Sequence, residues 1–133
     1  MTDLPKKILI VEDDELITQM YQASLATSRF ELRIEKDGGK GWEALQQYVP
    51  DLIILDMMMP KLNGIEVLTR VRADARLQHV PVVIMSSLMD EEDRKKALDL
   101  GANEYWIKRD VNMTSFEAEI NRVLQTSVGS PTA

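Results

Sequence analysis

The sequence predicts an α/β fold, a doubly wound sheet of five parallel strands with helices on both faces. Segments that favour strands alternate five times with segments that favour helices. Several strand segments are continuous apolar runs, which is typical of strands buried on both faces of a parallel sheet. The chain has 133 residues, too few for a closed eight-fold barrel, which needs about 200 or more. We therefore expect one domain with an open sheet.

Five segments are the strand candidates. Three are short apolar runs rich in β-branched residues, one alternates as expected for a strand with an exposed face, and the last is the short segment EYWI. In chain order they are Lys7 to Val11, the alternating Glu31 to Lys36, Asp51 to Leu55, Val80 to Met85, and Glu104 to Ile107.

A helix is expected after each strand. Four of the segments carry apolar stripes at helical spacing. These stripes are Ile17, Met20, Tyr21 and Leu25; Trp42, Leu45 and Val49; Ile65, Leu68 and Val71; and Phe116, Ile120, Val123 and Leu124. The second helix is expected to stop at Pro50. The remaining helix, between Asp90 and Gly101, is indicated by acids at its start, bases further on and a glycine at its end.

Local signals set several helix starts. Asn63 precedes Glu66 by three residues and Thr114 precedes Glu117 by three, so both pairs fit a capping box. The segment from Asp37 to Gly39 reads as a turn.

The composition excludes several classes of function. The chain is 44% hydrophobic and 29% charged, with a net charge of −6, so a packed core is expected and a nucleic-acid-binding face is not. There is no cysteine, which excludes disulfides, thiol catalysis and cysteine-based zinc sites. No run approaches the roughly 20 apolar residues of a membrane helix, and no signal peptide is recognisable. We expect a cytoplasmic protein that binds no membrane.

The second strand leads into the turn that starts at Asp37, whereas candidate site residues with charged and hydroxyl side chains follow the other four strands. They are Glu12, Asp13 and Asp14 after the first, Asp56 after the third, Ser86 and Ser87 after the fourth, and Lys108 after the fifth. In open parallel sheets, sites form at the carboxyl ends of the strands. Clustered carboxylates suit a hard cation such as Mg²⁺, and a lysine with a hydroxyl would bind phosphate oxygens. The set therefore suits phosphoryl transfer onto an aspartate. Asp14 is expected mainly to start the first helix.

Four motifs stand in order at these strand ends: ILIVEDDE, LIILDMMMPKLNGIEVL, VPVVIMSS and ALDLGANEYWIK. With them the chain resembles the receiver domain of two-component response regulators over residues 6–125, and residues 126–133 read as a tail or the start of a linker. The resemblance implies a flavodoxin-like, CheY-like (βα)₅ fold with strand order 2-1-3-4-5.

The resemblance also implies a metal and an acceptor. Asp56 would be the phosphorylated residue. Asp13 would bind Mg²⁺ directly and Glu12 through water, and the backbone carbonyl of Met58 would be a further ligand.

Three other side chains match the switch of the family. Ser86, rather than Ser87, would be the hydroxyl that turns toward the phosphoryl group. Lys108 would contact that group, and Tyr105 would be the aromatic that moves inward with the hydroxyl.

The implied function is a phosphorylation-controlled switch. A histidine kinase or phosphotransfer protein would supply the phosphoryl group. The surface of the fourth helix, fifth strand and fifth helix would then control a partner or an output domain. The protein would be a monomer or a phosphorylation-dependent dimer, and not an enzyme acting on a separate substrate. One alternative is a docking module that works without phosphorylation. A Mg²⁺-dependent aspartyl phosphohydrolase is a weaker alternative, because Met58 stands where that class needs a second aspartate.

The sequence also departs from the family pattern. Arg109 follows Lys108 where the family usually has a proline in a cis bond, and we expect a trans bond here because a non-proline cis bond costs about 3 kcal/mol. Pro60 and Gly64 match the turn after the acceptor.

Two positions that influence hydrolysis in this family are Met58, two residues past the acceptor, and Leu88, two past the hydroxyl. Both are apolar, so neither can orient an attacking water. We therefore expect slower self-dephosphorylation than in receivers with polar residues at these positions.

Overall fold

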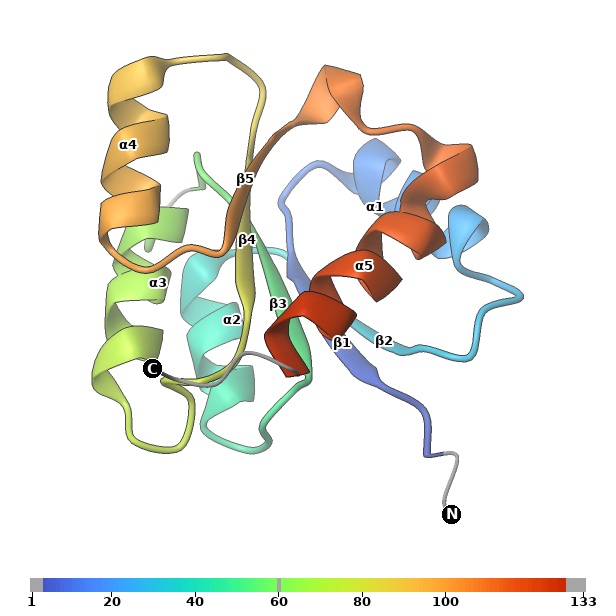
Figure 1. Ribbon diagram of the computed structural model, residues 1–133, viewed down its shortest axis with the longest axis horizontal. Coiled ribbons are helices and arrows are strands. Elements are labelled where there is room, and N and C mark those ends of the chain that lie inside the picture. The colour runs from blue at the N-terminus through green and yellow to red at the C-terminus, as the bar shows by residue number, and fades with distance from the viewer. Residues whose placement is uncertain (1–3, 60, 129–133) are drawn as a thin grey trace.

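The computed structural model describes residues 4–59 and 61–128. It contains one five-stranded parallel sheet with strand order β2-β1-β3-β4-β5 and a helix after each strand (Figure 1). The strands are β1 (Lys7–Val11), β2 (Glu31–Glu35), β3 (Leu52–Asp56), β4 (Val82–Ser86) and β5 (Glu104–Ile107). The helices are α1 (Glu15–Ser24), α2 (Gly38–Leu45), α3 (Gly64–Ala73), α4 (Glu91–Asp99) and α5 (Phe116–Val128), with short 3₁₀ turns η1 (Lys108–Asp110) and η2 (Met113–Ser115) before α5. The predicted fold class and strand order are confirmed.

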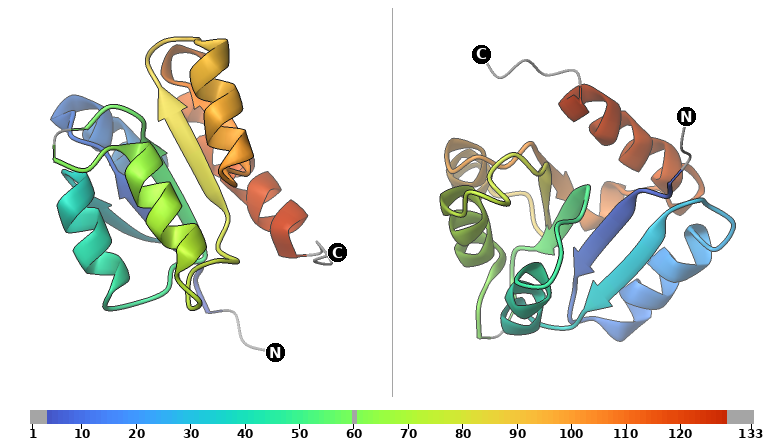
Figure 2. Two further views of the ribbon diagram at one scale, coloured as in Figure 1. Left: turned by 90° about the vertical axis from the view of Figure 1, so that its left-hand side faces the viewer. Right: turned by 90° about the horizontal axis from the view of Figure 1, so that it is seen from below.

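The sheet separates two apolar cores, because alternate side chains of each strand point to opposite faces. On β1, Leu9 and Val11 pack into the core under α2, α3 and α4, whereas Ile8 and Ile10 pack under α1 and α5. Figure 2 shows the two helical layers on the two faces of the sheet. No helix in residues 4–59 and 61–128 has the length and apolarity needed to cross a membrane.

The start and end of the second helix differ from the sequence-based expectation. Asp37 is its N-cap, and the carboxylate accepts the backbone N–H of Lys40 at 2.7 Å, so Gly38 and Gly39 belong to the helix and not to a turn. The helix ends at Leu45, and Val49, which was expected on its buried stripe, is 44% exposed. On the first helix, Met20 is likewise exposed.

The last helix also starts differently. Asn63 and Glu66 form the predicted capping box of α3, but Thr114 and Glu117 do not cap α5. Instead the Asn112 side chain accepts the N–H of Thr114 and starts η2, from which α5 continues. The helix reaches Val128, so residues 126–128 of the expected tail are helical, and residues 129–133 lie outside the described residues.

Helix α4 is held mainly at its C-terminal end. Its only buried residue is Ala97, and Gly101, which follows the helix, has a φ of 108°, a conformation that favours glycine. The guanidinium of Arg72 on α3 donates hydrogen bonds at 2.8 and 3.0 Å to the Gly101 carbonyl. The same group donates to the Val80 carbonyl at 2.7 Å and to the Asn103 side chain at 3.0 Å. Arg72 therefore ties α3 to the start of β4 and to the α4–β5 turn.

Candidate functional site at the carboxyl edge of the sheet

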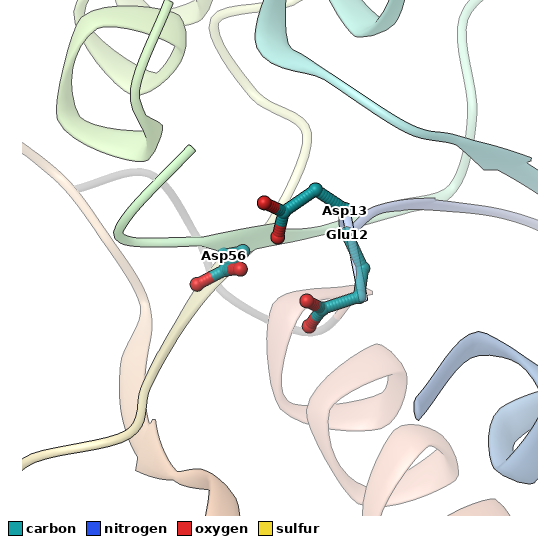
Figure 3. Close-up of side chains that lie close together, drawn as sticks. All are labelled: Glu12, Asp13 and Asp56. Carbon is teal, nitrogen blue, oxygen red and sulfur yellow. The ribbon is translucent and has the colours of Figure 1, made fainter. Parts of the chain in front are cut away.

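Three carboxylates converge where β1 and β3 end. Glu12 and Asp13 follow β1, and Asp56 is the last residue of β3. Figure 3 shows the three side chains close together, and one oxygen from each lies within 4.8 Å of the others. Glu12 and Asp56 are almost completely buried, at 1% and 4% exposure, while Asp13 is exposed. The edge of the sheet thus carries a concentrated negative charge, as the strand-end pattern predicted.

Lys108 supplies the balancing cation. It is the first residue after β5, and its side chain is 14% exposed. Its Nζ lies 2.9 Å from Glu12 Oε1 and 3.1 Å from Asp56 Oδ2, so one ammonium bridges two buried carboxylates. Burial alone would lower the pKa of Lys108, but hydrogen bonding and charge attraction from these two carboxylates raise it above its usual value.

The buried carboxylates are further held by backbone donors. Asp56 Oδ1 accepts the N–H of Met58 at 3.2 Å, and Glu12 Oε2 accepts the N–H of Asp14 at 3.1 Å. Burial raises the pKa of Glu12; the hydrogen bond from Lys108 opposes this shift and the neighbouring Asp56 carboxylate adds to it. Asp14 caps α1, as expected from the sequence.

The hydroxyl groups of Ser86 and Tyr105 converge on one backbone segment. Ser86, the last residue of β4, is 5% exposed; its Oγ donates to the Leu88 carbonyl at 3.0 Å and accepts the Leu88 N–H at 3.2 Å. The Tyr105 hydroxyl donates to the same carbonyl at 3.4 Å. Ser87 is exposed. Ser86 and Tyr105 are therefore joined through the backbone carbonyl of Leu88. No sequence motif predicts this link.

The peptide bond between Lys108 and Arg109 is trans, as predicted, since residues 4–59 and 61–128 contain no cis bond. The chain turns directly into η1, and the Val111 N–H bonds the Lys108 carbonyl at 3.2 Å. The expectation for Pro60 falls outside the described residues.

Gly64 allows a close backbone approach beside Asp56. A Cβ at this position would lie 2.5 Å from the Asp56 carbonyl oxygen and 3.2 Å from the Met57 Cα. We predict that Gly64→Ala destabilises the protein by about 1–3 kcal/mol, because rigid backbone has to move. Urea unfolding measures this loss. Gly39→Ala is the control, since its Cβ would meet only the Asp37 carboxylate at 3.2 Å, and equal losses in both variants would contradict the prediction.

The donor set fits a hard cation. Carboxylate oxygens are the ligands that Mg²⁺ and Mn²⁺ favour, and Glu12, Asp13 and Asp56 could hold such an ion. The Met57 backbone carbonyl accepts a hydrogen bond from the Gly64 N–H at 3.2 Å, so this carbonyl already has a partner within the protein.

The comparisons with known proteins agree with this geometry. The family model of the response regulator receiver domain matches residues 8–121. The chain is 34% identical over 126 residues to the alkaline phosphatase synthesis transcriptional regulatory protein PhoP of Bacillus subtilis, covering 92% of this chain and 50% of PhoP. It is 35% identical over 102 residues to the DNA-binding dual master transcriptional regulator RpaA of Synechocystis, covering 77% of this chain and 42% of RpaA. The chain thus spans about half the length of the curated relatives it matches.

Two solved structures match nearly the whole chain. The Mn²⁺-bound form of the response regulator Rcp1 has a TM-score of 0.78 at 31% identity, with 96% of this chain and 98% of that chain covered. The phosphorylated cyanobacterial phytochrome response regulator RcpA has a TM-score of 0.79 at 31% identity, with 96% and 97% covered. Sequence, fold and site agree, and the chain belongs to the response regulator receiver domain family of two-component systems.

Proposed function

We propose that this receiver domain accepts a phosphoryl group on Asp56 from a histidine kinase or phosphotransfer protein. The observation that carries this proposal is the position of the Asp56 carboxylate, at the end of β3, 3.1 Å from the Lys108 ammonium and beside Glu12 and Asp13. A carboxylate placed between a cation and a cluster that could hold a metal is suited to attack phosphorus.

In the transfer step, an Asp56 oxygen forms the new O–P bond while the P–N bond of the donor phosphohistidine breaks. The bonding electrons return to the imidazole nitrogen. The Lys108 ammonium neutralises charge on the phosphoryl oxygens, and its second contact, to Glu12 at 2.9 Å, keeps it in position.

We propose that Mg²⁺ is held by the side chains of Asp13, Glu12 and Asp56 and by the backbone carbonyl of Met58. Glu12 would act through water. When bound, the ion would offset the negative charge that gathers on the transferring group. Asp13, the exposed member of the cluster, is the acid most open to a hydrated ion.

The switch would pass through Ser86 and Tyr105. Both hydroxyls are now bonded to the Leu88 carbonyl, and a phosphoryl group on Asp56 would offer Ser86 a stronger, charged acceptor. Moving Ser86 would alter the Leu88 segment and the Tyr105 contact, and so the surface of α4, β5 and α5.

Other parts of the function follow from the family. The domain, residues 6–125, would control a separate partner or an output domain, as a monomer or a phosphorylation-dependent dimer in the cytoplasm. It would itself contact neither nucleic acid nor membrane. It would catalyse only its own phosphorylation and dephosphorylation.

Labelling with acetyl phosphate and Mg²⁺ tests the proposal. We expect the wild-type protein to incorporate one phosphoryl group and Asp56→Ala to incorporate none. Asp99→Ala, which removes an exposed carboxylate on α4, should be labelled like the wild type. Label that survives Asp56→Ala would contradict the assignment. If the wild-type chain takes up no label and binds neither Mg²⁺ nor beryllofluoride, the docking-module alternative holds instead.

The phosphoryl group on Asp56 is predicted to be long-lived. Met58 and Leu88 are 74% and 71% exposed apolar side chains, so neither holds a water near the acyl phosphate. Met58→Asn adds an amide that can orient water, and we expect hydrolysis to become roughly two- to tenfold faster. Decay of the phosphorylated protein measures this, with Met58→Leu as the apolar control. Unchanged or slower decay in Met58→Asn would contradict the prediction.

A further inference from the structure

The three consecutive methionines after the acceptor lie in different environments. Met57 and Met59 are 6% and 9% exposed and belong to the core under α2, α3 and α4. Met58, between them, is 74% exposed. The Met57 N–H still bonds the Met85 carbonyl at 2.7 Å, so the chain leaves the sheet one residue later and turns the Met58 side chain outward. The same residue type therefore occurs in both buried and open surroundings within three positions.

The backbone of Met58 is also hydrogen-bonded to the Asp56 carboxylate. Its backbone N–H donates to Asp56 Oδ1 at 3.2 Å, which keeps the residue beside the carboxylate. Two of the polar side chains at this edge are already engaged: Lys108 bonds Glu12 and Asp56, and Ser86 bonds the Leu88 backbone. A new hydrogen-bond acceptor on Met58 would be added at an exposed position that is now apolar.

We propose that the Met58 thioether is a site of oxidation by hydroperoxides, and that the resulting sulfoxide shortens the lifetime of the phosphoryl group on Asp56. In the oxidation, one peroxide oxygen is transferred to sulfur, the O–O bond breaks, sulfur loses two electrons, and hydrogen peroxide leaves as water. The second half of this inference rests on the proposed phosphorylation of Asp56, whereas the first half does not.

The chemical change at Met58 is large. A thioether is a weak hydrogen-bond acceptor, whereas a sulfoxide carries a strongly polar oxygen. That oxygen can orient a water beside the acyl phosphate, as a polar side chain at this position would. Met sulfoxide is reducible by methionine sulfoxide reductases, so the modification is reversible in a cell. The site would couple phosphoryl lifetime to the oxidant level.

Peptide mapping of the unphosphorylated full chain after graded hydrogen peroxide tests the first half. Fragment ions separate the three neighbouring methionines, and we expect Met58 to be oxidised about tenfold or more faster than Met57 and Met59. Met20 and Met89, 46% and 49% exposed, are the exposed references. Equal rates for all three neighbours, or a Met58 rate well below the references, would overturn the inference.

Decay of phospho-Asp56 after the same treatment tests the second half. We expect oxidised wild type to lose its phosphoryl group roughly two- to tenfold faster than untreated protein. Met58→Leu should show no acceleration, although its other exposed methionines are oxidised, and Met58→Gln, a polar mimic, should decay faster without oxidant. Acceleration that persists in Met58→Leu, or none in wild type with oxidised Met58, would overturn the coupling. A wild-type chain that takes up no label would instead contradict the proposed function and leave the mapping result standing.

Discussion

Lys108→Met is expected to destabilise the metal-free protein by about 3–5 kcal/mol at neutral pH. The ammonium lies 2.9 Å from Glu12 and 3.1 Å from Asp56, and both carboxylates are almost completely buried. The variant leaves two neighbouring carboxylates without a cation, which is costlier than losing an exposed ion pair. Urea unfolding at neutral pH with a chelator measures the loss.

Two conditions separate this cause from simple loss of packing. Excess Mg²⁺ should recover part of the lost stability, because an ion at the acidic cluster replaces the missing charge. Lower pH should also reduce the deficit. A carboxyl with a raised pKa costs stability above that pKa and none well below its unfolded pKa, so protonating Glu12, whose pKa burial raises, removes one unpaired charge.

The matched control is Lys95→Met. Lys95 is paired with Asp99 at 2.7 Å, but this pair lies on the exposed face of α4. The stability of the Lys95→Met variant should therefore stay close to that of the wild type. A Lys108→Met loss no larger than that of Lys95→Met, or a deficit that neither Mg²⁺ nor acid reduces, would show that the ammonium does not balance the buried carboxylates.

Much of this site could be predicted because strand ends are marked in the sequence. Asp56 and Ser86 end apolar runs, and in a parallel sheet the carboxyl ends of all strands meet at one edge. Lys108 follows β5, and its approach to Asp56 therefore follows from topology. The order of the strands came from family resemblance, since alternating β-α units alone permit several orders.

Other features depend on details that the sequence pattern does not carry. The Lys108 contact to Glu12 depends on the side-chain path across the edge of the sheet, and the link between Ser86 and Tyr105 depends on a backbone carbonyl. The start of the second helix was missed because Asp37-Gly38 is a turn signal as well as a cap, and the capping hydrogen bond decides between them.

Arg72 illustrates the same point most clearly. In the sequence it is one of several charged residues on α3, whereas in the structure its guanidinium makes five hydrogen bonds, all to neutral acceptors. Two go to the Gly101 carbonyl, and the Asn103 oxygen that takes another also accepts the Val82 N–H at 2.9 Å. Burial lowers the pKa of Arg72, which is expected for a cation whose bonds here go to no carboxylate.

Arg72→Met is therefore expected to cost about 2–4 kcal/mol, because partly buried carbonyls lose their donors. Helix α4 should respond most: it buries only Ala97, and Arg72 holds the turn at its C-terminal end. The variant should speed up hydrogen exchange of the α4 amides more than that of the α3 amides, relative to the wild type. Urea unfolding should report the overall loss of stability. The control is Arg94→Met, which removes an exposed contact to Glu91 at 3.7 Å and should leave stability nearly unchanged. If both variants lose the same stability, or if α4 exchange stays at the wild-type rate in Arg72→Met, the guanidinium does not anchor this helix.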